Sequence, residues 1–247
     1  MKQLIKNLDQ YSPLPLQLNG VRDKLVITDG NDHYLLKFGM LTAQGESKDY
    51  LTEYMASEMG AMLGYEVHQV ALGHYHGRPC AVIRMFPQIP VSFNGLGTST
   101  VSGRKLTLKG RYDRHEGNWG FIKNTTGKYV IAPLYDNGSS LGHRLFIENN
   151  TSKIDLLDAI INQPKSAIYI NGKKKNYFEG VKGLLGNPLF LAVGEDFLTR
   201  LSKANFKPIY DAVRHYDGQY DRLLSYLEEG IKKRGDLIAR SLSVRSR

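Results

Sequence analysis

The chain has 247 residues, of which 41% are hydrophobic and 23% are charged, an ordinary composition for a soluble globular protein. No run approaches about 18 consecutive apolar residues, so we predict no transmembrane helix, and residues 1–15 lack the unbroken apolar stretch of a signal peptide. The single cysteine, Cys80, excludes an intrachain disulfide and a cysteine-based zinc site. We therefore expect a reducing compartment, which is the cytoplasm or the interior of a host cell into which the protein is delivered as an effector.

The formal net charge of +9 favours polyanionic partners such as nucleotide phosphates, nucleic acid or acidic lipid surfaces. Much of the excess lies in residues 171–180 and 232–247, where a solvated face and a frayed tail explain it equally well. We predict no membrane partner, and we treat nucleic acid as a partner of the basic surface but not the primary one.

The first ninety residues alternate strand and helix patterns. Residues 24–39 predict a hairpin, because two strand-like runs flank Asp-Gly-Asn-Asp, which is strong turn chemistry. Residues 50–64 predict a helix with Thr52 as its cap and Gly64 at its end. Residues 65–86 predict two more strands. The order strand, strand, helix, strand, strand indicates a small antiparallel sheet with one helix, an α+β arrangement.

Residues 87–110 are rich in Gly, Ser and Thr, which is typical of a boundary between lobes. We therefore predict two domains, an N-lobe over residues 1–90 and a C-lobe over residues 91–247.

The C-lobe begins with a second predicted hairpin over residues 120–133 and is otherwise expected to be mostly helical. The helical patterns cover residues 152–163, residues 194–216 with an interruption at Pro208, and residues 219–242.

Three polar residues have the types and the order that phosphoryl transfer needs. Asp113 and Asn118 share one loop, and Asp136 follows a hairpin that would fold it back beside them. An Asp that positions the attacking hydroxyl, together with an Asn and a second Asp that hold Mg²⁺ on nucleotide phosphates, forms such a site. Each residue taken alone is more often a turn former.

A cation for the phosphates is expected upstream of this loop. Lys37 lies in mid-strand between Leu36 and Phe38, and strand alternation places it on the opposite face from both. A strand Lys oriented by a helix Glu contacts nucleotide phosphates in kinases, and Glu53 is the first candidate for that Glu, with Glu58 as the second. Alone, Lys37 reads equally as an edge-strand charge, and Glu53 as a favourable charge near a helix N-terminus.

With these residues in place, the sequence resembles the HipA-like serine/threonine kinases, a family of bacterial toxin-type protein kinases. Residues 113–119, DRHEGNW, match the family's catalytic loop of the form D-x-H-x-x-N followed by an aromatic residue. Residues 132–136, APLYD, match its metal-binding segment. Residues 20–39 resemble the loop and strand that cover the nucleotide, and residues 83–86, IRMF, lie where the hinge between the lobes would be.

The resemblance implies a bilobal protein-kinase-like fold, with ATP and Mg²⁺ as cofactors. Asp113 would be the base or hydroxyl-positioning residue, while Asn118 and Asp136 would bind Mg²⁺. Lys37, oriented by Glu53, would contact the ATP phosphates. The remaining residues expected around the nucleotide are Gly20 and Lys24 from the covering segment, Met85 and Phe86 from the hinge, and His115, which would brace the catalytic loop.

Three features of the sequence depart from the family pattern. About two dozen residues separate the hinge from Asp113, where the family usually places supporting helices, so we expect a trimmed C-lobe. The family's extra N-terminal subdomain is missing as well, so a partner chain or a small antitoxin is expected to supply it. The covering loop also has no serine between Asn19 and Lys24, so the family's autophosphorylation control is not expected there.

The primary prediction is an ATP- and Mg²⁺-dependent kinase acting on Ser or Thr of a protein substrate, as a toxin of a toxin–antitoxin pair or as a secreted effector. One alternative is a pseudokinase-like module that binds nucleotide or nucleic acid without transfer. The second alternative is a kinase that acts on the hydroxyl of a small molecule, because a fold does not fix the acceptor.

Overall fold

The computed structural model describes residues 5–16, 23–43, 45–85, 91–92, 120–123, 128–134, 138, 141, 165–170, 173–176 and 185–243. The chain divides into two compact units, each assembled from separate stretches of sequence. The first comprises residues 1–89, 133–152 and 206–224, and the second comprises residues 90–132, 153–205 and 225–247.

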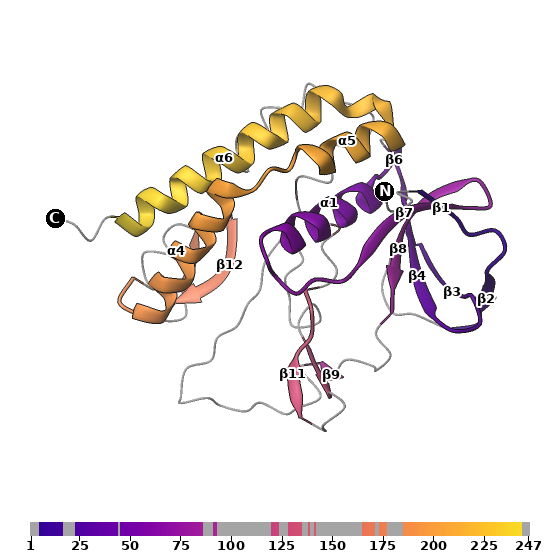
Figure 1. Cartoon of the computed structure of the whole chain (residues 1–247), viewed down its shortest axis with the longest axis horizontal. Coiled ribbons are helices and arrows are strands. Elements are labelled where there is room, and N and C mark those ends of the chain that lie inside the picture. The colour runs from indigo at the N-terminus through magenta and orange to yellow at the C-terminus, as the bar shows by residue number, and fades with distance from the viewer. Residues whose placement is uncertain are drawn as a thin grey trace. The chain divides into compact units, whose positions relative to one another are not determined.

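A six-stranded sheet forms the framework of the first unit, with the strand order β1-β7-β8-β4-β3-β2 (Figure 1). Its strands pair antiparallel, except that β1 runs parallel to β7 at one edge. The strands are β1 (Ile5–Asn7), β2 (Ser12–Leu14), β3 (Lys24–Thr28), β4 (His33–Phe38), β7 (Val70–Tyr75) and β8 (Arg78–Arg84). A two-stranded ribbon of β5 (Leu41–Thr42) and β6 (Gly45–Glu46) follows β4.

The hairpin predicted over residues 24–39 is confirmed as β3 and β4. Its turn forms because Asp29 Oδ1 accepts the backbone N–H groups of Asn31 and Asp32, at 2.9 and 2.8 Å. Those hydrogen bonds lower the pKa of Asp29. Gly30, at φ 95°, supplies the left-handed residue that the turn needs.

Helix α1 (Asp49–Met62) is the helix expected over residues 50–64. Gly64, at φ 78°, follows the helix end as predicted. The prediction of Thr52 as the cap is wrong, because the helix begins at Asp49 and Thr52 lies inside it, fully buried. All seven residues from Asp49 to Met55 are buried, so the first two turns of α1 are enclosed on every side.

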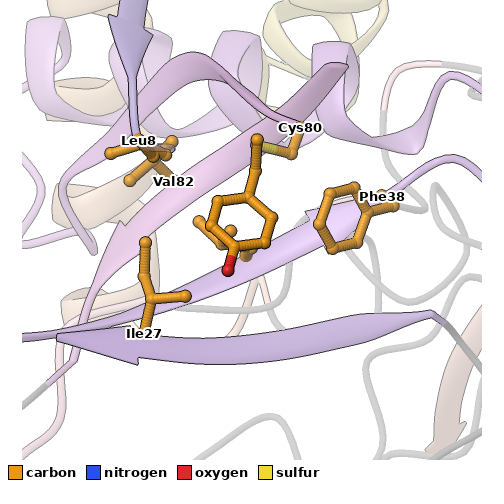
Figure 2. Close-up of a cluster of buried hydrophobic side chains, with 7 residues drawn as sticks. Leu8, Ile27, Phe38, Cys80 and Val82 are labelled. Carbon is orange, nitrogen blue, oxygen red and sulfur yellow. The ribbon is translucent and has the colours of Figure 1, made fainter. Parts of the chain in front are cut away.

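A hydrophobic core fills the face of the sheet that carries Leu36 and Phe38. Figure 2 shows the labelled side chains converging from β3, β4, β8 and the segment after β1. Cys80 belongs to this core with no exposed surface, and its burial raises the pKa of the thiol to about 12. The cluster consists of Leu8, Ile27, Leu36, Phe38, Tyr75, Cys80 and Val82.

Helix α5 (Lys207–Tyr216) and the turn η5 (Gly218–Tyr220) complete the first unit, and α5 packs against α1. The helical pattern predicted over residues 194–216 is interrupted before Pro208, as expected, although its first helix begins earlier, at Pro188. Proline cannot donate a backbone hydrogen bond in a helix interior but is tolerated in the first turn, and Pro208 lies in the first turn of α5.

The second unit has two small sheets. Strands β10 (Gly120–Lys123) and β11 (Tyr129–Ile131) confirm the predicted second hairpin, and β9 (Val91–Ser92) joins its edge. Strands β12 (Lys165–Ile170) and β13 (Lys173–Asn176) pair antiparallel. This pair was not predicted; helices still make up most of the described residues after residue 133, as expected. The Asn-Gly dipeptide between the strands is a hairpin signal that sequence analysis overlooked.

Two helices of the second unit pack closely together. α4 (Pro188–Lys203) is capped by Asn187, whose side chain accepts two backbone N–H groups. α6 (Asp221–Ser243) starts in the first unit and continues in the second, close to the helix expected over residues 219–242. A Cβ on Gly235 would meet a methyl group of Leu201 at 2.8 Å, so glycine permits the close approach of α6 to α4. No helix in the described part of the chain is long and apolar enough to cross a membrane.

Candidate active site

The centre of the candidate site is an ion pair between β4 and α1. Strand alternation turns Lys37 away from the core that contains Leu36 and Phe38. On that face the ammonium Nζ of Lys37 lies 3.0 Å from Oε2 of Glu53. The side chains are 12% and 1% exposed, so water screens the pair weakly.

Of the two carboxylates considered as partners for Lys37, Glu53 forms this ion pair. Glu58 lies one turn further along α1, is half-buried, and its charge adds to burial in raising the pKa of Tyr54 to about 12. A buried carboxylate paired with a cation fixes the direction in which that cation points. The pair therefore holds a positive charge at a defined place on the sheet.

A second lysine shares the face and the row of Lys37. Lys24 of β3 is the residue directly opposite Lys37 in the strand register, and paired residues project on the same side of a sheet. Two cations in this arrangement repel each other unless anions lie near them. Glu53 supplies one negative charge, and a polyphosphate would supply more. The chemistry of this row therefore fits the phosphates of a nucleotide.

The next row on the same face is apolar. Val26 and Leu35 are partners across β3 and β4, and Ile83 of β8 is the partner of Leu35 on its other side. An apolar strip beside a cationic row suits a ligand with one flat, apolar part and one anionic part.

On both sides of Asp136, residues of the predicted metal-binding segment form hydrogen bonds to other residues of the first unit. Leu134 forms a parallel bridge to Val67, with backbone hydrogen bonds to Glu66 and His68 of 2.8 and 2.9 Å. Four residues later, the carbonyl of Gly138 accepts a hydrogen bond from the hydroxyl of Thr52. Thr52 precedes Glu53 on α1, so one turn of helix contacts both Lys37 and this segment.

A buried histidine lies beside these contacts. The backbone N–H of His68 donates to Leu134, and its carbonyl accepts the hydroxyl of Ser57 on α1. Burial, and after it the charge of Lys37, lowers the pKa of His68 to about 4. His68 is therefore a neutral imidazole near pH 7.

Of the other residues expected at the site, Met85 lies in the described part of the chain and the rest lie outside it. Met85 directly follows β8 and is half-buried, and its N–H donates to the carbonyl of His33 at 2.8 Å. Within the described residues, no group of three or more His, Cys, Asp or Glu is placed to hold a metal ion. Six predicted site residues lie outside the described part, namely Gly20, Phe86, Asp113, His115, Asn118 and Asp136.

Two residues of this region were not predicted to belong to it. Thr52 was interpreted as a cap, but it lies inside the helix and its hydroxyl donates a hydrogen bond to the distant Gly138. His68 carried no signal, because its burial depends on the bridge between Val67 and Leu134, far apart in the chain.

Comparison with known proteins gives one related sequence and a similar solved structure. The serine/threonine-protein kinase CtkA of Helicobacter pylori is 43% identical over 205 residues, which cover 64% of this chain and 63% of the relative. The chain thus spans less than two thirds of the length of that relative. No model of a known protein family matches the chain.

The crystal structure of a Helicobacter pylori proinflammatory kinase CtkA superposes with a TM-score of 0.74 at 21% identity. The superposition covers 98% of this chain and 99% of that one, and it confirms the predicted α+β, protein-kinase-like fold. HipA from a Shewanella oneidensis toxin–antitoxin complex with operator DNA superposes at a TM-score of 0.49 and 12% identity, over 97% and 74% of the two chains. That similarity is too low to support an inference.

Proposed function

We propose that the chain is an active kinase of the HipA-like type that transfers the terminal phosphoryl group of ATP to Ser or Thr of a protein substrate, because a serine/threonine-protein kinase is 43% identical to it over 205 residues. The observation that carries the proposal is the buried ion pair of Lys37 and Glu53. It holds a cation on the face of the sheet where two lysines and an apolar strip lie side by side, as a bound nucleotide requires.

The described residues would bind and orient the nucleotide. Lys37, held by Glu53, would contact the phosphates, and Lys24 would add a second positive charge from the neighbouring strand. The half-buried Leu35 would offer apolar surface to the base, next to the hinge residue Met85. Each role follows from the position of the residue on one face of the sheet.

The predicted metal ligands suit the same location. Asp136 lies between Leu134 and Gly138 in the sequence, and both of these residues are hydrogen-bonded to residues of the first unit. Asp136 and Asn118 offer the oxygen donors that Mg²⁺ prefers. When bound, Mg²⁺ would neutralise phosphate charge.

The transfer itself would use Asp113. The substrate hydroxyl oxygen forms a bond to the terminal phosphorus while the bond from that phosphorus to the bridging oxygen breaks. ADP leaves, and the Asp113 carboxylate accepts the hydroxyl proton. Asp113 and Asn118 are five residues apart, as in the family's catalytic loop.

The test is transfer of labelled phosphate from ATP to the protein itself or to a generic Ser/Thr substrate, with Mg²⁺ present. Asp113→Ala and Asp136→Ala are expected to abolish labelling while leaving the fold intact by circular dichroism. Equal labelling of the wild type and both variants would overturn the proposal. Phosphoamino-acid analysis of the product separates Ser and Thr from other acceptors.

Other outcomes of this test correspond to the two alternatives. Nucleotide binding without turnover would indicate a binding module, and a label on a small molecule would indicate a different acceptor class. A toxin or effector role, the cellular compartment and a small antitoxin partner stay predictions, to be tested by co-purification from the native host.

A further inference from the structure

The segment over residues 206–224 packs its apolar side into the first unit, although it follows α1 by about 150 residues in the chain. The buried positions of α5 recur at helical spacing, and they continue through η5 into the first turn of α6. They are Ile209, Tyr210, Ala212, Val213, Tyr220, Leu223 and Leu224. The segment is therefore an integral part of the unit that holds the Lys37–Glu53 pair.

Tyr216, the last residue of α5, connects this segment to two elements at once. Its hydroxyl donates a 2.8 Å hydrogen bond to the carbonyl of Gly73 on β7. Its ring meets the ring of Tyr50 on α1 edge-on, with centroids 6.2 Å apart and planes at 71°. The ring of His74 lies on another side, with centroids 5.1 Å apart. Tyr216 thus lies between the sheet and the first turn of α1.

Tyr50 is the residue of α1 whose ring contacts the ring of Tyr216. It is 1% exposed and precedes Glu53 by three positions, so the two side chains lie on neighbouring parts of the helix surface. Displacement of Tyr50 along or around the helix axis would displace Glu53 by a similar amount, because a helix moves as a rigid body over one turn.

Ion pairs connect residues on either side of Tyr216. Arg214 contacts Asp211 at 3.0 Å through Nη1 and Asp221 at 2.6 Å through Nε. This bridge spans the junction between α5 and α6 on either side of Tyr216. It limits the freedom of the turn that presents the Tyr216 ring to α1.

We propose that Tyr216 is a positioning residue for the nucleotide site: it holds α1 through Tyr50, and so keeps Glu53 where it orients Lys37. The C-terminal segment over residues 206–224 thereby acts as a built-in clamp on the helix. The catalytic consequence rests on the proposed kinase function, whereas the structural consequence does not.

The experiment compares Tyr216→Phe, Tyr216→Ala and the neighbouring exposed control His215→Ala, all in the full chain. Hydrogen–deuterium exchange measures the amides of α1, and affinity is measured with a non-hydrolysable ATP analogue. We expect Tyr216→Ala to speed exchange in α1 and to weaken analogue binding about tenfold, equivalent to about 1.4 kcal/mol. Tyr216→Phe keeps the ring, so we expect its α1 exchange rates and its analogue affinity to lie between those of the wild type and Tyr216→Ala. His215→Ala should match the wild type in both measurements.

A double-mutant cycle separates positioning from general destabilisation. In a Glu53→Gln background, Tyr216→Ala should weaken analogue binding by less than a further twofold. The reason is that Glu53→Gln already removes the orientation of Lys37 on which Tyr216 acts. Additive effects of the two changes on affinity, or unchanged exchange in α1, would overturn the proposal. If Tyr216→Ala does not fold, the same cycle is run with Tyr216→Phe. Absence of phosphate transfer in the wild type would count against the kinase function alone, since exchange and binding still report on Tyr216.

Discussion

The hydroxyl of Thr52 donates a hydrogen bond to the carbonyl of Gly138, 86 residues later in the chain. The next residue, Glu53, pairs with Lys37 across 3.0 Å. One turn of α1 therefore joins the strand that carries the cation to the segment that carries Asp136.

Removing one member of the Lys37–Glu53 pair should destabilise the protein strongly. Lys37→Met leaves the 1%-exposed carboxylate of Glu53 without the cation 3.0 Å away. Breaking a buried pair in this way costs about 3–5 kcal/mol, whereas replacing both charges with apolar residues is often neutral. We expect a large loss in the free energy of unfolding in urea for Lys37→Met, and a much smaller one for Lys37→Met with Glu53→Leu.

The matched control for that measurement is the exposed pair of Arg84 and Asp32, whose side chains are 57% and 36% exposed. Arg84→Met should change the free energy of unfolding by less than about 1 kcal/mol, because water screens the pair. Similar losses for Lys37→Met and Arg84→Met would contradict the buried geometry.

Thr52→Val should loosen the segment that carries Asp136. The substitution keeps the shape of the side chain but removes the donor to Gly138, leaving a buried carbonyl without that hydrogen bond, at a cost of about 1–3 kcal/mol. Phosphate transfer should fall more steeply than stability if Asp136 holds the metal ion. Thr199→Val removes a comparable hydroxyl bond on the exposed surface of α4 and should leave both quantities near wild type.

His68 should make the protein less stable in mild acid. Its pKa is lowered from 6.5 to about 4, so between these values the unfolded chain binds a proton that the folded chain does not. Stability is therefore fully present above about pH 6.5 and falls as the pH drops toward 4, by up to about 1.4 kcal/mol per unit. In urea titrations at several pH values, His68→Asn should flatten this slope.

Gly60→Ala should disturb the bridge between Val67 and Leu134. A Cβ at residue 60 would lie 2.7 Å from a methyl group of Val67, so the side chain must shift. Overpacking of this kind costs about 1–3 kcal/mol and should exceed the gain of about 1 kcal/mol in helix propensity. Adding Val67→Ala should recover stability, as measured by thermal unfolding.

Gly186→Ala is the control for this pair of variants, because nothing lies within 4 Å of the added Cβ. A loss of stability in Gly60→Ala that Val67→Ala does not reduce would show that the contact with Val67 is not its cause.

Short-range sequence patterns predicted the parts of the fold that depend on contacts between residues close together in the chain. The turn from Asp29 to Asp32 carries its own hydrogen bonds, so the β3–β4 hairpin was predicted to the residue. Alternation along β4 likewise placed Lys37 opposite the core. Such signals need no information from distant parts of the chain.

The misinterpreted residues depend on distant contacts. Thr52 has the composition of a cap, and only its bond to Gly138 reveals another role. The parallel pairing of β1 with β7 joins segments about 67 residues apart, and three residues of β1 carry too short a pattern to predict it. The contact of Tyr216 with Tyr50 links two helices whose own patterns predict only that each has an apolar side.

Seven successive buried side chains leave the first two turns of α1 without a solvent-facing side. A helix enclosed in this way cannot swing outward without opening the packing around it. The cation and its carboxylate are therefore assembled before any ligand arrives. We expect nucleotide capture to proceed as a single-step association, with an observed rate that rises in proportion to ligand concentration and does not level off at a rate set by helix movement.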